Sequence, residues 1–401
     1  MESTDTALAR AVNNLRFNTE KQKADDLAAI EKAVVNIKVF GVGGGGNSVL
    51  KRMADSAGDH DPELVAVNTD SHALSVFNSG VKIIQIGESL TGGHGTGGNV
   101  SLGEQAARID EERIKSAMYG SDMIFITAGM GGGTGTGAAP FVAKMAKELG
   151  ILTIGVVTLP FSFEGIRKKR TANEGIIKMQ SDMDALIVVQ NDNLMNLPEN
   201  KSLSIVDAFK AADSVLRQAI NCIAELVLTT GFINVDFADV MTIFQQSESS
   251  DAILGIGRSS SRAVKAVQEA IASPLIDKSL KGARGMIFNI TGDDESLSLY
   301  EVNEAASYIY KQTEDDVNII FGAVIDKEMK GVVQATIIAT DFADSLALKS
   351  PKVGVPKSQV TVSKGFNFDA QKFPTKKDTG KTGGVIPAFN FINRNRDKDD
   401  K

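Results

Sequence analysis

The sequence predicts an α/β protein with a mainly parallel sheet covered by helices on both faces, followed by a smaller α+β layer. Two observations carry this prediction. In the first half of the chain, short runs that are apolar on both faces alternate with helical patterns, as buried parallel strands do. Two of these strand runs end in glycine-rich loops that lead into helices, at residues 41–47 and 129–140.

The first half of the chain contains six predicted strands with helical patterns between several of them. The strands are at residues 36–42, 64–67, 82–86, 123–127, 151–157 and 186–189, and the clearest helices are at 101–118 and 141–149. Ligands of such sheets bind beyond the carboxyl ends of the strands. We therefore expect both glycine loops at that edge, together with a third glycine-rich run at 92–99.

One long helix is predicted over residues 203–230, where apolar residues recur every three or four positions. At about 1.5 Å per residue it spans roughly 40 Å, which is long enough to connect two domains. Cys222 lies on this helix, and we interpret it as a packing residue.

A second unit follows the long helix. Its predicted strands are at 252–256, 285–290, 317–325 and 332–340, and its predicted helices are at 261–272 and 299–310. Four strands and two helices in this order predict a smaller α+β domain.

Composition bounds the function. The chain has 401 residues, of which 42% are hydrophobic and 23% charged, as in a soluble globular protein. A net charge of -7 predicts no general attraction to nucleic acid. The single cysteine excludes an internal disulfide and fits a reducing cytosol. Because no run of about eighteen apolar residues occurs, we expect no membrane insertion, and the acidic N-terminus does not resemble a secretory signal.

We predict six segments along the chain. They are an N-terminal extension (1–34), a nucleotide-binding domain (35–202), a central helix (203–231), a C-terminal α+β domain (232–341), a disordered linker (342–383) and a partner-binding peptide (384–401). The linker assignment rests on eight lysines and three prolines with little apolar pattern. The last segment is apolar again, which is typical of a docking peptide.

Residues 129–140 read Gly-Met-Gly-Gly-Gly-Thr-Gly-Thr-Gly-Ala-Ala-Pro, and six of the first nine are glycine. Such a loop lets the backbone approach a ligand and point consecutive N–H groups at it, and the next helix adds its positive end. We predict a phosphate-binding loop, since a tight turn or linker does not need six glycines between a buried strand and a helix. Neither glycine loop carries a lysine, so backbone N–H groups and a metal ion such as Mg²⁺ would meet the phosphate charge.

Gly41-x-Gly43-x-x-Gly46 also matches the dinucleotide fingerprint, with Asp70 as a candidate ribose-binding acid. A nicotinamide-dependent oxidoreductase is therefore an alternative. The second glycine loop and the absence of an evident His or Tyr pair for hydride transfer argue against it. The chain has three histidines, which we interpret as surface or loop residues.

Two carboxylates, Asp236 and Asp239, lie three residues apart just beyond the long helix, in the run Asn234-Val-Asp-Phe-Ala-Asp. Spacing alone slightly favours an N-cap with acidic charge in the first helical turn. The functional alternative is that these carboxylates orient a water or hold a cation for phosphate-ester hydrolysis. Because a long helix separates them from the glycine loops, they are not expected to reach a phosphate bound there.

Together these motifs resemble the FtsZ family, the bacterial tubulin-like GTPases of cell division. The resemblance covers residues 36–340 in order. It rests on both glycine loops, Asn68-Thr-Asp70, Pro160-Phe-Ser-Phe-Glu-Gly165, Asn191-Asp192 and the run from Asn234 to Asp239. It implies a tubulin-like fold and hydrolysis of GTP to GDP and phosphate with Mg²⁺, with a K⁺ requirement left open.

The resemblance also implies roles for individual residues. The GTP phosphates would be held by Gly44, Gly45, Gly46, Asn47, Ser48, Gly133, Thr134 and Gly135. Glu164 would hold the ribose, and Asn191, Phe209 and Asp213 would select guanine through its N1 and N2 donors. Lys168 stands where most members have arginine, so it keeps the charge but loses the two-pronged hydrogen bonding. The implied catalytic residues are Asn234, Asp236 and Asp239, in the synergy loop, and no metal ligand is assigned.

The resemblance further implies head-to-tail filaments that form the division ring at mid-cell, in the cytoplasm beneath the inner membrane. Such stacking is heterologous and does not close. The acids of one subunit would enter the next subunit's nucleotide site, so that assembly completes the active site. The run Ile386-Pro387-Ala388-Phe389 would bind membrane-tethering and regulatory proteins. A non-hydrolysing nucleotide-binding scaffold stays open as a further alternative.

Overall fold

The structure is a computed structural model. It describes residues 35–56, 61–77, 80–196, 200, 202–228, 235–247, 249–276, 278–313 and 317–342. The predicted N-terminal extension, Asn234, the linker beyond residue 342 and the partner-binding peptide with Ile386, Pro387, Ala388 and Phe389 lie outside the described residues.

The first half of the chain forms a parallel sheet, as predicted. Its strands are β1 (Ile37–Val42), β2 (Glu63–Asn68), β3 (Val81–Gln85), β4 (Met123–Gly129), β5 (Leu152–Leu159) and β6 (Ala185–Gln190). They lie in the order β3-β2-β1-β4-β5-β6, and every neighbouring pair is parallel. Both glycine loops therefore leave from the same, carboxyl edge of the sheet.

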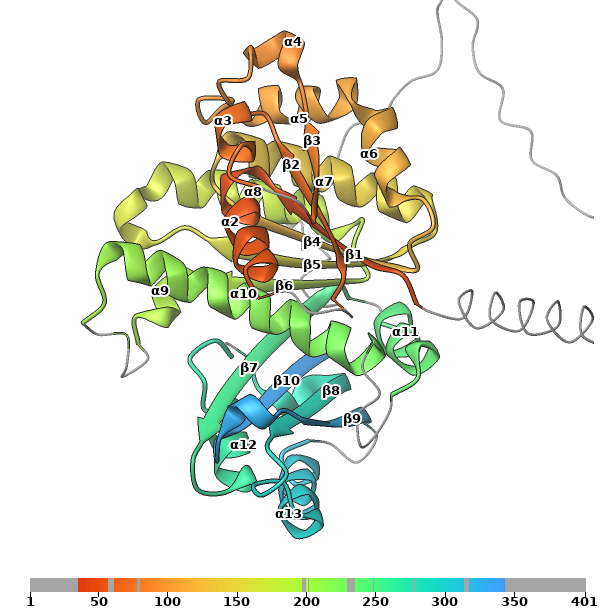
Figure 1. Cartoon of the computed structure of the whole chain (residues 1–401), viewed down its shortest axis with the longest axis vertical. Coiled ribbons are helices and arrows are strands. Elements are labelled where there is room, and N and C mark those ends of the chain that lie inside the picture. Colours follow the sequence, from red (N-terminus) through yellow and green to blue (C-terminus); the bar gives the residue numbers. More distant parts are fainter. Residues whose placement is uncertain are drawn as a thin grey trace, which may run out of the picture. The chain divides into compact units, whose positions relative to one another are not determined.

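Helices cover both faces of this sheet (Figure 1). One face packs on α5 (Val100–Ile109), α6 (Glu111–Met118), α7 (Gly133–Glu148) and α8 (Ile166–Gln180), and the other on α2 (Gly43–Ala54) and α10 (Ile205–Leu228). Val39 and Phe40, neighbours on β1, belong to opposite cores. This double burial explains why the strand runs carry apolar residues on both faces.

The helix predicted over 101–118 is wrong as a single element. It is divided into α5 and α6 at Asp110, whose backbone has φ -99° and ψ 22°. The Asp110 carboxylate accepts hydrogen bonds from Gly87 N at 2.7 Å and from Arg113 Nη1 at 2.9 Å. These bonds satisfy the side chain at the junction, where an aspartate competes with regular helical hydrogen bonding.

The C-terminal strands are β7 (Asp251–Ser259), β8 (Ala283–Gly292), β9 (Asn318–Ile325) and β10 (Val333–Phe342), with α12 (Ala263–Ile271) and α13 (Leu299–Tyr310). Their order is β7-β10-β8-β9, and β10 is antiparallel to both of its neighbours. Through Leu186 and Ile187, β6 pairs in parallel with β7. In the described part of the chain, the two groups of strands thus form one continuous 10-stranded sheet.

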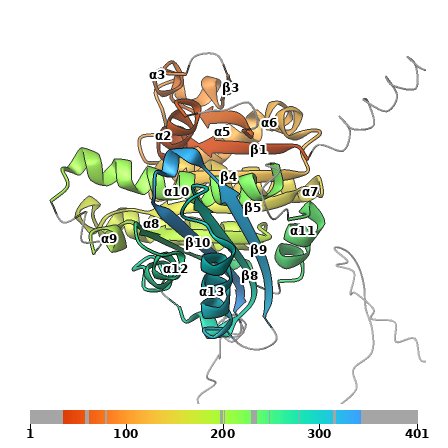
Figure 2. The same ribbon diagram turned by 60° about the horizontal axis from the view of Figure 1, so that its bottom comes forward.

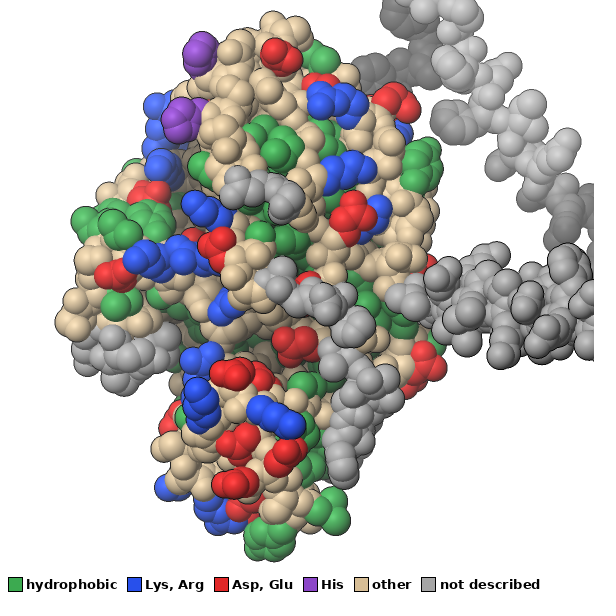
Figure 3. All heavy atoms as spheres, in the orientation of Figure 1, with side chains coloured by type: hydrophobic (Ala, Val, Ile, Leu, Met, Phe, Trp, Pro, Cys, Tyr) green, Lys and Arg blue, Asp and Glu red, His purple; other side chains and the backbone are tan. Residues whose placement is uncertain are grey.

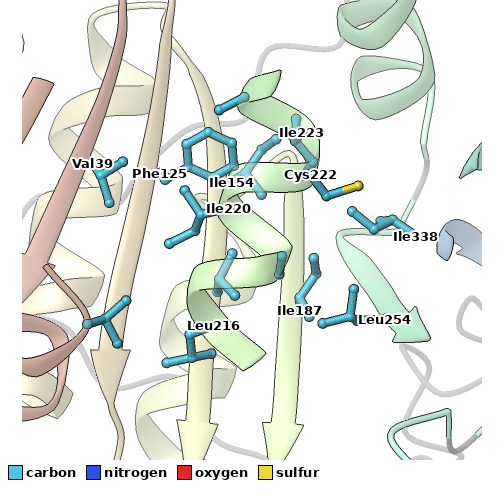
Figure 4. Close-up of a cluster of buried hydrophobic side chains, with 14 of the residues drawn as sticks. Val39, Phe125, Ile154, Ile187, Leu216, Ile220, Cys222, Ile223, Leu254 and Ile338 are labelled. Carbon is cyan, nitrogen blue, oxygen red and sulfur yellow. The ribbon is translucent and has the colours of Figure 1, made fainter. Parts of the chain in front are cut away.

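The long helix α10 lies between the two groups of strands and packs on both (Figure 4). Its Ile220 faces sheet residues such as Phe125 and Ile154, while Leu254 and Ile338 come from β7 and β10. All five are buried in one core. Cys222 is buried in the same core, which confirms its interpretation as a packing residue.

The two ends of α10 lead to different parts of the molecule. The short helix α9 (Asn191–Leu194) lies at its amino-terminal end, and α11 (Phe237–Gln245) lies at the other, where it packs on β8 and β9 (Figures 1 and 2). At about 1.5 Å per residue, the 24 residues of α10 separate these ends by about 36 Å.

Acidic and basic side chains are interspersed on the face shown in Figure 3. Of the three histidines, the structure describes His72 and His94, and both are exposed. None of the helices in the described ranges is both long enough and apolar enough to cross a membrane.

Candidate functional site

The amino-terminal ends of α2 and α7 meet at the carboxyl edge of the sheet. A Cβ atom on Gly43 would lie 2.7 Å from Gly135 N, and one on Gly45 would lie 2.8 Å from Gly129 N. The backbones therefore touch in a way that only glycine allows, and Gly43 also has a positive φ of 72°. Within the described ranges, no side chain caps either helix. The free N–H groups of two first turns thus share one region, which suits an anion.

Gly44 lies at the open side of this junction, since a Cβ there would meet no atom of a described residue within 4 Å. Gly46 is buried against Gly41 and the β4 backbone. Asn47 is 4% exposed, and Ser48 Oγ donates to Gly44 O at 3.1 Å. The five residues predicted for this loop are consecutive along the first turn of α2.

The third glycine-rich run, at 92–99, joins the same site. A Cβ on Gly133 would lie 2.8 Å from Asn99 N and would collide with Thr96 Oγ1. Thr134 Oγ1 lies 2.7 Å from Thr69 Oγ1 and 3.5 Å from Thr96 Oγ1. A buried group of hydroxyls therefore connects the α7 terminus to the loops that follow β2 and β3.

The start of α8 borders the glycine loop of α7. A Cβ on Gly131 would lie 3.0 Å from Lys168 O. Lys168 Nζ donates to Glu164 Oε2 at 3.0 Å, and Phe161 N donates to Glu164 Oε1 at 3.0 Å. Both oxygens of Glu164 are thus held in place, although each keeps a lone pair for another donor.

Three aromatic rings connect the segment around Glu164 to α10. Phe163 stacks on Phe161 with ring centroids 5.1 Å apart, and Phe209 meets Phe161 edge-on at 5.2 Å. Phe163 is 62% exposed and Phe209 is 40% exposed. Such exposed rings offer flat apolar faces on which a base can stack.

Two polar side chains lie nearby in the fold. Asn191, the first residue of α9, is 4% exposed, and its Oδ1 has no hydrogen-bond partner among the residues that the structure describes. Asp213 lies one turn beyond Phe209 on α10, and its Oδ2 accepts from Arg52 Nε at 3.0 Å. Burial raises the pKa of Asp213, and the bond and charge of Arg52 oppose that rise.

These contacts close a ring around one region. Its links run from α2 to α7, from α7 to α8, from α8 through the phenylalanines to α10, and through Asp213 and Arg52 back to α2. One side offers backbone N–H groups for phosphates, and the other offers aromatic faces and acceptor atoms. The unpartnered Asn191 Oδ1 needs a donor, which the N–H groups of guanine supply. The residues present therefore fit a guanine nucleotide.

The predicted acids lie elsewhere. Asp236 is the N-cap of α11, where its Oδ1 accepts from Ala238 N at 3.3 Å, and Asp239 is in the first turn. Asp239 also borders a hollow of about 300 Å³ with residues of β9. Because α11 follows the far end of α10, the chain does not bring these acids to its own glycine loops.

Two other features lie outside the ring. Asp70 caps α3 (Ser71–Leu74) by accepting from His72 N at 2.9 Å, so its carboxylate serves the local helix. A cavity of about 650 Å³ lies between α10 and the β7–α12 region and contains none of the predicted site residues. Within the described ranges, no group of three His, Cys, Asp or Glu side chains is arranged to hold a metal ion.

The sequence predicted no individual role for five side chains of the ring, namely Arg52, Thr69, Thr96, Phe161 and Phe163, although Thr69, Phe161 and Phe163 lie in motifs that carry the family resemblance. Thr96 lies in the third glycine run and Phe163 beside Glu164, so both had a local signal. Arg52 had none, because it looks like any exposed helical arginine until α10 is packed against α2.

Two family models match the chain. The GTPase domain of the tubulin/FtsZ family matches residues 36–199, and the FtsZ C-terminal domain matches residues 250–343. These matches favour a GTPase over the oxidoreductase interpretation.

Solved structures agree with these models. An FtsZ dimer from M. jannaschii is 38% identical, with a TM-score of 0.73, and the match covers 80% of this chain and 92% of that one. CetZ1 from Haloferax volcanii, a GDP-bound monomer, is 20% identical with a TM-score of 0.67, over 79% and 97% of the two chains. CetZ2 from the same organism, a GTPgS-bound protofilament, is 20% identical with a TM-score of 0.63, over the same shares.

Proposed function

The chain belongs to the tubulin/FtsZ family of GTPases, and from this premise we propose that it polymerises head to tail into FtsZ-type filaments that form the division ring. The single observation that carries this proposal is the separation of the guanine-nucleotide site from Asp236 and Asp239 by the length of α10. Two incomplete half-sites at opposite ends of one subunit become one complete site when a second subunit stacks on the first.

The comparisons support the FtsZ type. Identity to the M. jannaschii FtsZ dimer is 38%, against 20% for the CetZ structures, and the C-terminal match is to the FtsZ model. The relatives are described as a dimer and a protofilament, which supports self-association of this chain. We include in this proposal the six segments predicted from the sequence, from the N-terminal extension (1–34) to the partner-binding peptide (384–401).

At the nucleotide site, the first turns of α2 and α7 hold the phosphates through Gly44, Gly45, Gly46, Asn47, Ser48, Gly133, Thr134 and Gly135. Backbone N–H groups stabilise the charge that develops on the phosphoryl oxygens as the bond to the leaving GDP breaks. Glu164 accepts from the ribose, Lys168 supplies charge, and Asn191, Phe209 and Asp213 hold guanine. Mg²⁺, when bound, neutralises phosphate charge.

The neighbouring subunit supplies the second half of the chemistry. Asp236 and Asp239, with Asn234, orient a water whose oxygen attacks the terminal phosphorus of GTP, and a carboxylate takes the water's proton. The products are GDP and phosphate. Loss of the terminal phosphate weakens the contact between subunits, so the filament turns over.

The filaments act in the cytoplasm at mid-cell, beneath the inner membrane. Residues Ile386, Pro387, Ala388 and Phe389 bind membrane-tethering and regulatory proteins at the end of the linker. Whether K⁺ is required is tested by measuring phosphate release from GTP with Na⁺ in place of K⁺.

The proposal is tested by hydrolysis in trans. Asp239→Ala protein is loaded with γ-labelled GTP, separated from free nucleotide, and mixed with wild-type protein and an excess of unlabelled GTP that dilutes any label released. We expect labelled phosphate only when wild-type protein is added, with light scattering rising in parallel and ATP inactive. If Asp239→Ala hydrolyses its own label, or wild-type protein does not trigger release, the shared site is wrong.

A further inference from the structure

Arg52 and Asp213 form the ion pair that closes the ring between α2 and α10. Arg52 Nε donates to Asp213 Oδ2 at 3.0 Å, and the two side chains are 36% and 15% exposed. Arg52 lies about one and a half turns beyond Asn47 on the helix whose first turn faces the phosphate region. One helix therefore touches both ends of the nucleotide site.

The hydrogen bond from Arg52 occupies Oδ2 of Asp213 and leaves Oδ1 available to another donor. In the described part of the chain, Asp213 Oδ1 accepts no hydrogen bond, and Arg52 is the charged group that faces Asp213. Arg217, one turn beyond Asp213 on α10, donates instead to Ser56 Oγ at 3.1 Å. Burial raises the pKa of Asp213, and Arg52 counteracts it, so the charge of this carboxylate depends on one guanidinium.

Guanine presents two donors on one edge, N1–H and the N2 amino group, and an ionised carboxylate is their best acceptor. A protonated or rotated Asp213 would lose that ability, because it would present a donor or point away. We propose that Arg52 is a positioning residue for base selection, which holds Asp213 charged and leaves Oδ1 for guanine. This inference rests on the proposed function, in which Asp213 reads the base.

The test compares full-length variants by calorimetric titration with GDP and IDP between about pH 6 and 8.5. Inosine lacks the N2 amino group, so the ratio of the two affinities reports the contact to Asp213. Arg52→Gln removes the charge, and Arg52→Lys restores charge without the planar donor. Arg217→Gln is the matched control, because it also joins α10 to the end of α2 but does not touch Asp213.

For Arg52→Gln we expect at least tenfold weaker GDP binding near pH 7.5, about the loss of one charge-assisted hydrogen bond. The preference for GDP over IDP should shrink. As the pH is lowered, GDP binding by the variant should begin to weaken at a higher pH than in the wild type, because Asp213 without Arg52 takes up a proton more readily. Arg52→Lys should recover part of the affinity, and Arg217→Gln should match the wild type.

Three outcomes overturn the inference: GDP affinity within twofold of the wild type, tighter binding, or an equal loss for GDP and IDP with an unchanged pH profile. Failure of the proposed function is distinguished with Asp213→Asn and XDP. An amide can donate to the 2-oxo group of xanthine, so this variant should exchange GDP preference for XDP preference. If it does not, Asp213 does not read the base, and the premise fails independently of Arg52.

Discussion

Lys168, in the first turn of α8, forms an ion pair with Glu164, which precedes that helix, with Nζ 3.0 Å from Oε2. The other carboxylate oxygen accepts from Phe161 N, also at 3.0 Å. The ammonium group, at a position where the resemblance implies an arginine, is therefore already engaged by Glu164. An arginine could keep this pair with one nitrogen and present others to the nucleotide.

We expect Lys168→Arg to bind GTP about two- to fivefold more tightly than the wild type, because a guanidinium offers additional charge-assisted donors. The measurement is a titration with a fluorescent GTP analogue. Lys169→Arg is the control, since Lys169 pairs with Asp192 at 3.7 Å instead. Unchanged or weaker GTP binding by Lys168→Arg would show that a guanidinium at this position donates no additional hydrogen bond to the nucleotide.

Gly133→Ala tests the close packing of the phosphate loops. Its Cβ would collide with Thr96 Oγ1 and crowd the Asn99 backbone, which must displace the α7 terminus from the third glycine run. We expect GTP affinity to fall at least tenfold, measured by the same titration. Gly282→Ala, whose Cβ meets only Phe342 at 3.7 Å, should bind normally. Normal binding by Gly133→Ala would refute the assigned phosphate loop.

The proposed catalytic role of Asp236 can be separated from its role as the N-cap of α11. Asp236→Ser keeps an N-cap for α11, whereas Asp236→Ala removes it at a cost of about 1 kcal/mol. We expect both variants to bind GTP normally and to lose at least a hundredfold in turnover, the usual contribution of acid–base catalysis. Only Asp236→Ala should also melt at a lower temperature.

Asp239→Ala completes that series, because Asp239 makes no side-chain hydrogen bond within the described residues. It should lose turnover with little change in melting temperature. If Asp236→Ser released phosphate at the full wild-type rate, Asp236 would act only as a helix cap and would have no catalytic role.

Glu225 makes stability depend on pH. Burial, together with the charges of Asp326 and Asp61, raises its pKa from 4.5 to about 7, against the opposing charge of Arg217. The folded chain therefore binds the proton more tightly than the unfolded chain. This contribution to stability is complete below about pH 4.5 and is lost as the pH rises through about 7.

The glutamine of Glu225→Gln is neutral at every pH, so this variant should lack the pH dependence of stability that Glu225 causes. Between pH 5.5 and 8, we expect the wild type to lose about 2 kcal/mol relative to this variant, read from urea unfolding at each pH. Glu148→Gln, at a half-exposed position on α7, should follow the wild type. Parallel curves for Glu225→Gln and the wild type would contradict a raised pKa.

Much of the fold follows from local pattern. The ten strand runs and the long helix were predictable because burial on both faces, or a 3.6-residue repeat, leaves a visible signature in the residues themselves. The division at Asp110 was not predictable, because it depends on Gly87, which is 23 positions away in the chain. The glycine content of the loops predicted phosphate binding. It did not predict that α7 begins at Gly133, inside the loop at residues 129–140.

By itself, the sequence determined the parallel sheet, the glycine loops, the two acids beyond the long helix and the resemblance that assigned their roles. The sheet, the glycine loops and the helical pattern are visible in composition and spacing, because short-range sterics and hydrogen bonding act on neighbouring residues, whereas the roles of the site residues are implied by the resemblance alone. Tertiary structure alone decided that the parallel and antiparallel strands share one sheet and that Arg52 meets Asp213. The reason is physical: contacts between residues 161 positions apart depend on how helices and strands pack, and packing leaves no mark on either neighbourhood taken alone.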